Sequence, residues 1–245
     1  MVKNNMNDKR LLAIMYDFYN EHTLRGQNDD INYYINIIKK FNLKNTLVVG
    51  AGTGRVAIPI SEYTNVDALD IDKERLMLLK EKDKTINTIN CNFLEYDNDN
   101  NKYDLIIFPY STIQFFGKYD LFELMINKAY EISNKNTIVI FDVSESFNKK
   151  LSINHELLFE CYCKKIDDNV RVYYTSIQHE DNIEFIIEYH LVSRNYSVYE
   201  HEFYLHYNSE IISKIVNNNN FKIIKIDDGY GKTGFNHKHV YHLKK

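Results

Sequence analysis

Residues 50–55 read GAGTGR, and this glycine-rich turn is the feature of the chain best suited to chemistry. It follows a short apolar run, Thr46–Val49, that fits a buried strand, and it opens a helical pattern. Glycine at positions 50, 52 and 54 permits a tight turn and lets a ligand approach backbone N–H groups at a helix N-terminus. The spacing therefore predicts a ligand-binding turn between a strand and a helix.

Polar and aromatic residues end the next apolar runs along the chain. Asp70 comes twenty residues after the first glycine of the turn, and a carboxylate there can bind both hydroxyls of a ribose. Asn92 and Phe93 follow a third run, and Pro109 and Tyr110 follow a fourth. Open α/β sheets bind ligands at the carboxyl ends of their strands, so these residues indicate a nucleoside site at one sheet edge.

The form of the glycine turn separates two classes of cofactor. A dinucleotide fingerprint has glycine at the sixth position, because a pyrophosphate sits on the turn, and this chain has Arg55 there. The G-x-G-x-G form instead suits S-adenosylmethionine, which carries no phosphate. The sequence also lacks a P-loop lysine motif, which excludes a P-loop NTPase. An S-adenosylmethionine site is therefore predicted, and an NAD-dependent oxidoreductase is the alternative that Arg55 disfavours.

Helical patterns alternate with apolar runs over the first 143 residues. Helices are expected over Asp8–Tyr19, Asp30–Phe41, the segment from the glycine turn to Tyr63, Lys73–Lys82 and Asp120–Ile132. Strands are expected over Thr46–Val49, Val66–Leu69, Ile86–Cys91, Asp104–Phe108 and Thr137–Val143. This alternation is typical of a doubly wound, Rossmann-like α/β fold, in which helices cover both faces of a parallel sheet.

The pattern changes to period two between about residues 155 and 207. Three or four antiparallel strands are expected there, inserted after the fifth strand of the α/β layout. A helix over Asn208–Val216 and strands over Phe221–Ile226 and His239–Leu243 follow. We therefore expect one domain over residues 1–245, with an N-terminal helical cap over residues 1–43.

These motifs together resemble class I S-adenosylmethionine-dependent methyltransferases over about Asp8–Val143, and more loosely beyond. The aromatic segment Tyr16–Tyr19, the segment Asp30–Tyr34 and the glycine turn are similar to those of bacterial small-molecule members. The insertion is similar to that of amino-sugar N-methyltransferases, where it forms part of the acceptor pocket or of the dimer surface. The resemblance implies a seven-stranded sheet whose last two strands form an antiparallel hairpin.

The resemblance also implies a cofactor site. Its members would be Tyr16, Gly50, Ala51, Gly52, Asp70, Ile71, Asn92, Phe93 and Pro109. In this site Asp70 would hold the ribose hydroxyls, and Ile71 and Phe93 would flank the adenine. Asn92 takes the place of the usual acid at the adenine amino group, and Tyr16 would reach the cofactor from the first helix.

The acceptor would be a small polar molecule, bound by residues near the fourth strand and in the second half of the chain. Candidates are Tyr19, Tyr110, Ser111, Gln114, His201 and Lys232. Many relatives have a histidine one turn after the fourth strand, and Phe115 occupies that position here. A neutral amine needs only a weak base, whereas a hydroxyl usually needs a positioned one. N-methylation of an amino sugar or a phosphorylated amino alcohol is therefore favoured over O-methylation.

The composition of the chain limits the kinds of partner that it is expected to bind. The net charge of −4 and the pI of about 6.1 argue against a nucleic-acid binder. The sequence Phe108-Pro109-Tyr110 is similar to part of a motif of amino-base methylases, so a nucleic-acid methyltransferase stays an alternative, as does a non-catalytic S-adenosylmethionine-binding protein.

Three cysteines and the C-terminal histidines make no metal-ligand pattern, so no metal is expected. No apolar run approaches the ~20 residues of a membrane span, and the start has no signal-peptide core. A cytoplasmic protein is therefore expected, in which strand edges of the insertion could pair across a homodimer.

Overall fold

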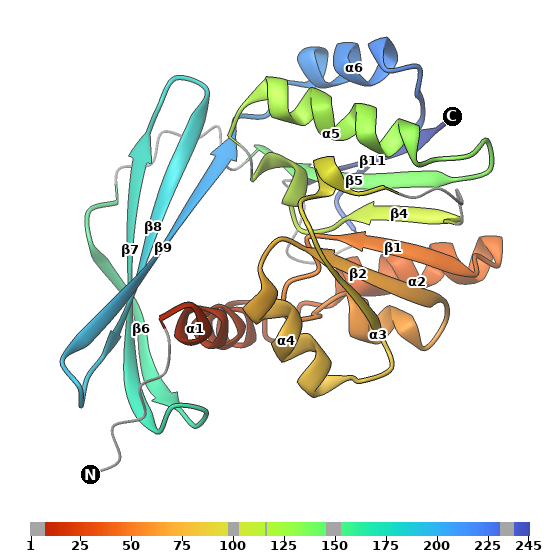
Figure 1. The fold of residues 1–245 in the computed structure, drawn as a ribbon. Helices are drawn as coiled ribbons and strands as arrows, with labels where there is room; N and C mark the ends of the chain where they lie inside the picture. Colours follow the sequence, from red (N-terminus) through yellow and green to blue (C-terminus); the bar gives the residue numbers. More distant parts are fainter. Residues whose placement is uncertain (1–7, 98–102, 116, 146–152, 231–237) are drawn as a thin grey trace.

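The computed structural model describes residues 8–97, 103–115, 117–145, 153–230 and 238–245. Within these ranges the strands form two sheets, a main sheet of seven strands and an insertion sheet of four. Figure 1 shows the insertion sheet standing beside the main sheet, with α1 (Asp8–Thr23) lying between the insertion sheet and α4 (Lys73–Lys82). No helix among the described residues is long and apolar enough to cross a membrane.

The main sheet has the strand order β10-β11-β5-β4-β1-β2-β3. Strands β1 to β5 pair in parallel, β11 pairs antiparallel with β5, and β10 pairs antiparallel with β11. The bounds are Asn45–Val49 (β1), Asn65–Asp70 (β2), Asn87–Asn90 (β3), Leu105–Phe108 (β4), Ile138–Ser144 (β5), Lys222–Asp228 (β10) and Lys238–Lys244 (β11). The predicted fold class, including the final antiparallel hairpin, is confirmed. The chain order reverses beside β1, which is where such sheets bind ligands.

Helices cover both faces of the main sheet (Figure 1). One face carries α2 (Asp29–Phe41), α3 (Ala57–Ser61) and α4, and the other carries α5 (Tyr119–Glu131) and α6 (Ser209–Asn218). Successive residues of β1 serve the two layers in turn: Leu47 and Val49 pack with α5 and α6, and Val48 packs with α2, α3 and α4. A strand buried on both faces explains the unbroken apolar runs in the sequence.

The insertion sheet consists of β6 (Glu156–Cys163), β7 (Asp168–Gln178), β8 (Asn182–Leu191) and β9 (Tyr196–Leu205), paired antiparallel in that order. Along β8 every second residue is buried, as the period-two pattern predicts. The inner face packs on α1 through a cluster that includes Ile14, Phe18, Val172 and Tyr189. The predicted antiparallel insertion after the fifth strand is confirmed, with four strands.

A buried carboxylate, Asp17, fastens α1 to its surroundings. It accepts hydrogen bonds from Thr53 in the glycine turn at 2.6 Å, from Lys82 in α4 at 2.5 Å and from Lys165 beside the insertion sheet at 2.6 Å. Burial by itself would raise the pKa of Asp17, but these hydrogen bonds and the two ammonium groups hold the pKa below its usual value. One side chain thus connects the cap helix to both sheets.

Several predicted element boundaries differ from those of the structure, most of them by one or two residues. The helix after the glycine turn is only Ala57–Ser61, because residues 52–56 form turns. Pro59 lies in the first turn of that helix, where a missing N–H costs nothing. The first helix continues four residues beyond Tyr19, to Thr23, and α5 begins at Tyr119 rather than at Asp120.

Candidate active site

The glycine turn lies at the carboxyl end of β1 in a backbone conformation that other residues rarely adopt. The φ angles are +69° at Gly50 and +54° at Gly52. A Cβ atom on Gly50 would lie 2.5 Å from Cγ2 of Thr112, and one on Gly52 would lie 3.2 Å from the ring of Tyr16. At Gly50 both the conformation and the space therefore require glycine, and at Gly52 the conformation favours it.

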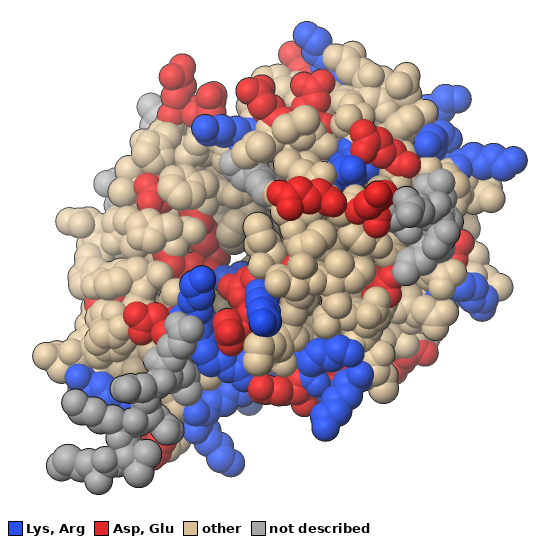
Figure 2. Space-filling view, in the orientation of Figure 1, with Lys and Arg blue, Asp and Glu red and all other residues tan. Residues whose placement is uncertain are grey.

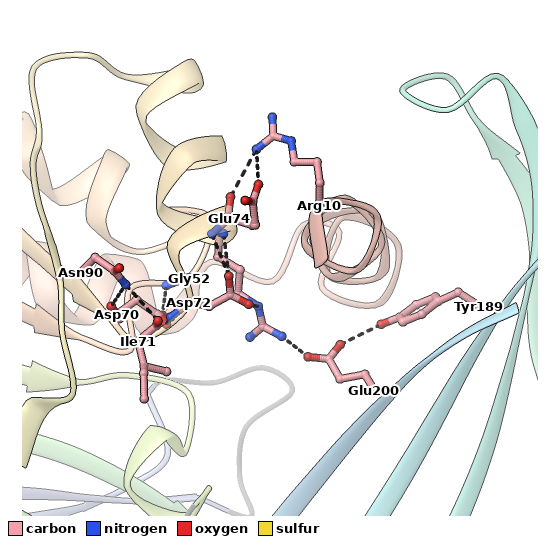
Figure 3. A network of polar contacts seen from close by, with 10 residues as sticks. Arg10, Gly52, Asp70, Ile71, Asp72, Glu74, Asn90, Tyr189 and Glu200 are labelled. Atoms are coloured by element: carbon pink, nitrogen blue, oxygen red, sulfur yellow. Dashed lines mark hydrogen bonds and ion pairs between the residues drawn. The ribbon is translucent and has the colours of Figure 1, made fainter. Parts of the chain in front are cut away.

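Asp70 ends β2 beside this turn. Its Oδ2 atom accepts the N–H of Gly52 at 2.7 Å, and its Oδ1 atom accepts the N–H of Asp72 at 2.8 Å. The side-chain amide of Asn90 donates to the carbonyl groups of Asp70 and Ile71, which holds the end of the strand (Figure 3). Burial raises the pKa of Asp70, and the two backbone N–H groups oppose that effect. Each carboxylate oxygen keeps a lone pair for a further donor.

A cavity of about 360 Å³ opens along this edge of the main sheet. Eight of the nine residues predicted for the cofactor line it: Tyr16, Gly50, Ala51, Asp70, Ile71, Asn92, Phe93 and Pro109. The ninth, Gly52, contacts Asp70 from the turn. The structure thus brings the predicted set together, and the part that each residue plays stays a prediction. In Figure 2 the surface is hollowed between the main part of the molecule and the insertion, with acidic side chains at the hollow.

The insertion sheet closes the cavity through charged residues that the sequence analysis missed. Arg75 of α4 forms an ion pair with Glu200 of β9, and its guanidinium lies 3.8 Å from the ring centre of Tyr16. The hydroxyl of Tyr189 also donates to Glu200, at 3.3 Å. Figure 3 shows Glu200 reaching from the insertion sheet toward the end of β2. Arg75 and Glu200 both line the cavity, so this ion pair joins its two walls.

Two consecutive residues after β4 adopt positive φ angles, +55° at Tyr110 and +60° at Ser111. Such conformations cost about 1–3 kcal/mol each in residues other than glycine and gather at functional sites. The ring of Tyr110 lines the cavity, between the guanidinium of Arg55 at 5.0 Å and the ammonium of Lys238 at 4.5 Å. Below it, the N–H of Ser111 donates to Asp142 at 2.8 Å, and Lys238 donates to the Ser111 hydroxyl at 2.8 Å. Ser111 is buried in this network and does not line the cavity.

The other predicted acceptor residues lie in different places. The side-chain amide of Gln114 exchanges hydrogen bonds with the backbone of Ser144 and donates to the carbonyl of Leu205, so it ties the main sheet to the insertion sheet. Tyr19 packs against Phe159 and Tyr189 outside the cavity wall, and burial raises its pKa to about 12.

His201 and Lys232 complete that set. His201 contributes to the cavity wall, but its ring pairs with Glu184 at 2.8 Å. Because side chains alternate along a strand, this ring lies on the opposite face of β9 from Glu200. Lys232 lies outside the described residues. Phe115, at the position where many relatives have histidine, lines the cavity and packs against Tyr204, with ring centres 4.8 Å apart.

The comparisons with known proteins agree with this geometry. Residues 47–136 match a family model described as a methyltransferase domain. This chain contains a methyltransferase domain. The match confirms the predicted resemblance to methyltransferases and, with it, the predicted enzyme class. None of the curated proteins matches the chain in sequence.

Solved structures resemble the methyltransferase over nearly its whole length. An S-adenosylmethionine-dependent methyltransferase from Clostridium acetobutylicum has 18% identity and a TM-score of 0.77, with 94% of this chain and 97% of that chain covered. The sugar N-methyltransferase KedS8 from Streptoalloteichus has 10% identity and a TM-score of 0.73, with 94% and 93% covered. The amino pentose methyltransferase CalS10 from Micromonospora echinaspora has 11% identity and a TM-score of 0.72, with 94% and 97% covered. At these identities the likeness establishes the fold.

The residues around the cavity fit S-adenosylmethionine. Asp70 offers a buried carboxylate with free lone pairs for two hydroxyl groups, and the glycine turn leaves no Cβ above the backbone. Ile71 lines the cavity while 72% of its surface is exposed, as expected for an apolar side chain that a flat ring would cover. When bound, this group supplies a positively charged sulfonium whose methyl carbon is open to attack. No cluster of residues that could hold a metal ion occurs in the described part of the chain.

Proposed function

We propose that this methyltransferase methylates the nitrogen of a small polar amine. The carrying observation is the composition of the cavity. The residues predicted for S-adenosylmethionine line it at the edge of the main sheet, and Glu200 and the rings of Tyr110 and Phe115 line it as well. Phe115 in place of histidine supports an amine over an alcohol, because an alcohol needs a stronger base near its hydroxyl. The sugar N-methyltransferase and the amino pentose methyltransferase of the same fold support an amino sugar as the acceptor class.

The residues of the chain have three tasks in such a reaction. Asp70 and the glycine turn hold the donor, so that its methyl group has a constant position. Tyr16 and Tyr110 line the cavity and narrow the approach of the acceptor. The insertion sheet excludes water, which raises the share of productive encounters and strengthens every charge interaction inside the cavity.

The acceptor is proposed to be a small molecule rather than a nucleic acid. The chain is acidic overall, and both arginines at the cavity are paired with carboxylates, Arg75 with Glu200 and Arg55 with Asp30. A nucleic-acid substrate needs basic groups that are available to contact its phosphates.

The test is product formation with matched pairs of acceptors. The protein is incubated with S-adenosylmethionine and either glucosamine or glucose, or either phosphoethanolamine or ethylene glycol phosphate, and S-adenosylhomocysteine is measured. We expect product with at least one amine and none with its matched alcohol. Product with an alcohol would contradict N-methylation. Binding of S-adenosylhomocysteine without product from any acceptor would favour the non-catalytic alternative.

A further inference from the structure

Glu202 is a buried carboxyl group that no step above has used. It lies on β9 between Glu200 and Tyr204, and alternation along the strand places all three side chains on the inner face. Only 9% of its surface is exposed. The hydroxyl of Tyr204 donates to Oε2 of Glu202 at 3.0 Å, and no other donor to this carboxyl is found among the described residues.

The charge of Glu202 is less well compensated than that of its neighbour. Glu200 forms an ion pair with Arg75 and accepts the hydroxyl of Tyr189, whereas Glu202 forms no ion pair within the described chain. Burial and the charge of Glu200 raise the pKa of Glu202 to about 8, although Arg75 and the Tyr204 hydroxyl oppose the rise. A carboxyl group in this state gains most from a cation placed next to it.

Glu202 is not itself among the residues that line the cavity, but its neighbours on both sides connect it to the cavity wall. Glu200, its neighbour on the inner face, lines the cavity, and Tyr204 on the other side packs against Phe115, which also lines the cavity. The rings near enough for the charge of Glu202 to raise their pKa are those of Tyr16, Tyr19, Tyr110, Tyr174, Tyr189 and Tyr204. Aromatic rings near a carboxyl group favour the binding of an ammonium ion, through cation–π attraction and charge pairing.

We propose that Glu202 receives the proton of the acceptor ammonium group and so produces the neutral amine that accepts the methyl group. The assignment rests on the proposed function. The ammonium N–H proton passes to the carboxylate of Glu202, and the nitrogen lone pair then forms the bond to the methyl carbon. The bond from that carbon to sulfur breaks, and its electron pair remains on sulfur as the neutral thioether. The product leaves as a methylated ammonium ion, so charge and atoms balance.

The test compares Glu202→Gln with Glu188→Gln. Glu188 lies on the outer face of the same sheet, bonded to Ser197 and His155, which makes it a matched control. With whichever of glucosamine and phosphoethanolamine the wild-type protein methylates, we expect kcat of Glu202→Gln to fall about 100-fold. Its Kd for S-adenosylhomocysteine should stay within about twofold of wild type, and Glu188→Gln should match wild type in both measurements. Glu202→Asp should recover part of the rate.

The pH profile separates proton acceptance from a structural role. Below pH 8 Glu202 is mostly protonated and cannot take a proton, so kcat/KM of the wild type should rise with pH and level near 8. The charged groups that face it are Glu200 and Arg75, which form an ion pair, and the titratable groups are the tyrosines named above, whose pKa values are all raised. The rising limb should be missing in Glu202→Gln. A variant with the wild-type rate and limb would overturn the assignment.

A second readout needs no acceptor. Because the pKa of Glu202 is higher in the folded protein than in the unfolded chain, the wild type loses stability as pH rises from about 4.5 to 8. The Tm of Glu202→Gln should therefore equal the Tm of the wild type near pH 4. As the pH rises toward 8, the Tm of the variant should exceed that of the wild type by a growing margin. A constant Tm difference would contradict the buried, poorly compensated carboxyl on which the assignment depends. Failure of the wild type to methylate either amine would overturn the proposed function, and the assignment with it, whatever the Tm result.

Discussion

The two walls of the cavity are built by different means. At the main-sheet wall a backbone turn with positive φ angles lies beside one carboxylate held by two N–H groups from the nearby chain. Where the insertion meets this wall, side chains from distant segments pair, as in the ion pair of Arg75 in α4 with Glu200 in β9, across 125 residues of sequence.

This difference has electrostatic consequences. On the main-sheet wall the hydrogen bonds to Asp70 oppose the effect of burial on its pKa. On the insertion side Glu202 sits among tyrosines with a single hydrogen-bond donor from the described chain, and its pKa rises to about 8. The fixed geometry beside the glycine turn suits a cofactor that is the same in every reaction cycle. A buried carboxyl group without an ion-pair partner in the described chain suits an acceptor that carries a positive charge. The experiments below test each side of that contrast.

The largest effect is expected at the turn. Gly50→Ala adds a Cβ atom 2.5 Å from Thr112 Cγ2, in a residue whose φ is +69°. Backbone strain and overpacking together should lower the free energy of unfolding by about 2–4 kcal/mol. Gly26→Ala is the control, because φ there is +77° and nothing lies within 4 Å. Thermal unfolding should show a clearly smaller loss for Gly26→Ala. Equal losses would mean that strain alone, and not the tight approach, requires glycine at position 50.

The second-largest effect is expected when the carboxylate of Asp70 is removed, which should weaken cofactor binding. Asp70→Ala loses two charge-assisted hydrogen bonds to hydroxyl groups, each worth about 1.5–3 kcal/mol, so the Kd for S-adenosylhomocysteine should rise about 100-fold or more. Asp67→Ala is a control on the same strand, where Asp67 accepts from Asn87 and Tyr103. Isothermal titration gives both values. A Kd for Asp70→Ala within about threefold of wild type would show that this wall does not bind the ribose.

The attachment of α1 should be sensitive to acid. Asp17→Asn removes the charge that pairs with Lys82 and Lys165, and we expect a loss of about 1–3 kcal/mol at pH 7, since both lysines are partly exposed. The pKa of Asp17 is lowered in the folded state, so its contribution is present above about pH 4 and is lost as pH falls through the folded pKa. Denaturation between pH 3 and 7 should show the two proteins converging at the acid end. A difference in the free energy of unfolding that stayed constant from pH 3 to 7 would contradict the ion pairing.

The smallest effect is expected on the outside of the insertion sheet. Arg171 and Glu160 pair at 2.7 Å, with about two fifths of each side chain exposed. Exposed pairs contribute little to stability because solvent screens the two charges, so Glu160→Gln should change Tm by no more than about 2 °C and leave methyl transfer unchanged. A larger change would mean that this face is covered by a partner, as a homodimer would require.

Local patterns in the sequence were enough for most of the fold and for the main-sheet wall. Apolar runs predicted the strands because strands buried on both faces are rich in apolar residues. The glycine turn and Asp70 are separated by a fixed strand–helix–strand unit. The short α3 was missed because turn residues and helix residues have similar propensities just after a glycine-rich loop. Arg75 was missed because a helix has several exposed positions, and only the insertion sheet selects the one that faces the cavity.

The sequence by itself thus determined the order of the elements, the fold class, the glycine turn and the carboxylate at the end of β2. Each depends on residue type and on spacing within one or two neighbouring elements. Tertiary structure alone decided which side chains of β9 meet the cavity and that Ser111 and Gln114 are engaged in internal networks. It also decided that Glu202 is buried without an ion-pair partner in the described chain. Those properties depend on how the insertion sheet docks against α1 and α4, and the energy of that docking is summed over contacts between segments that lie far apart in the chain.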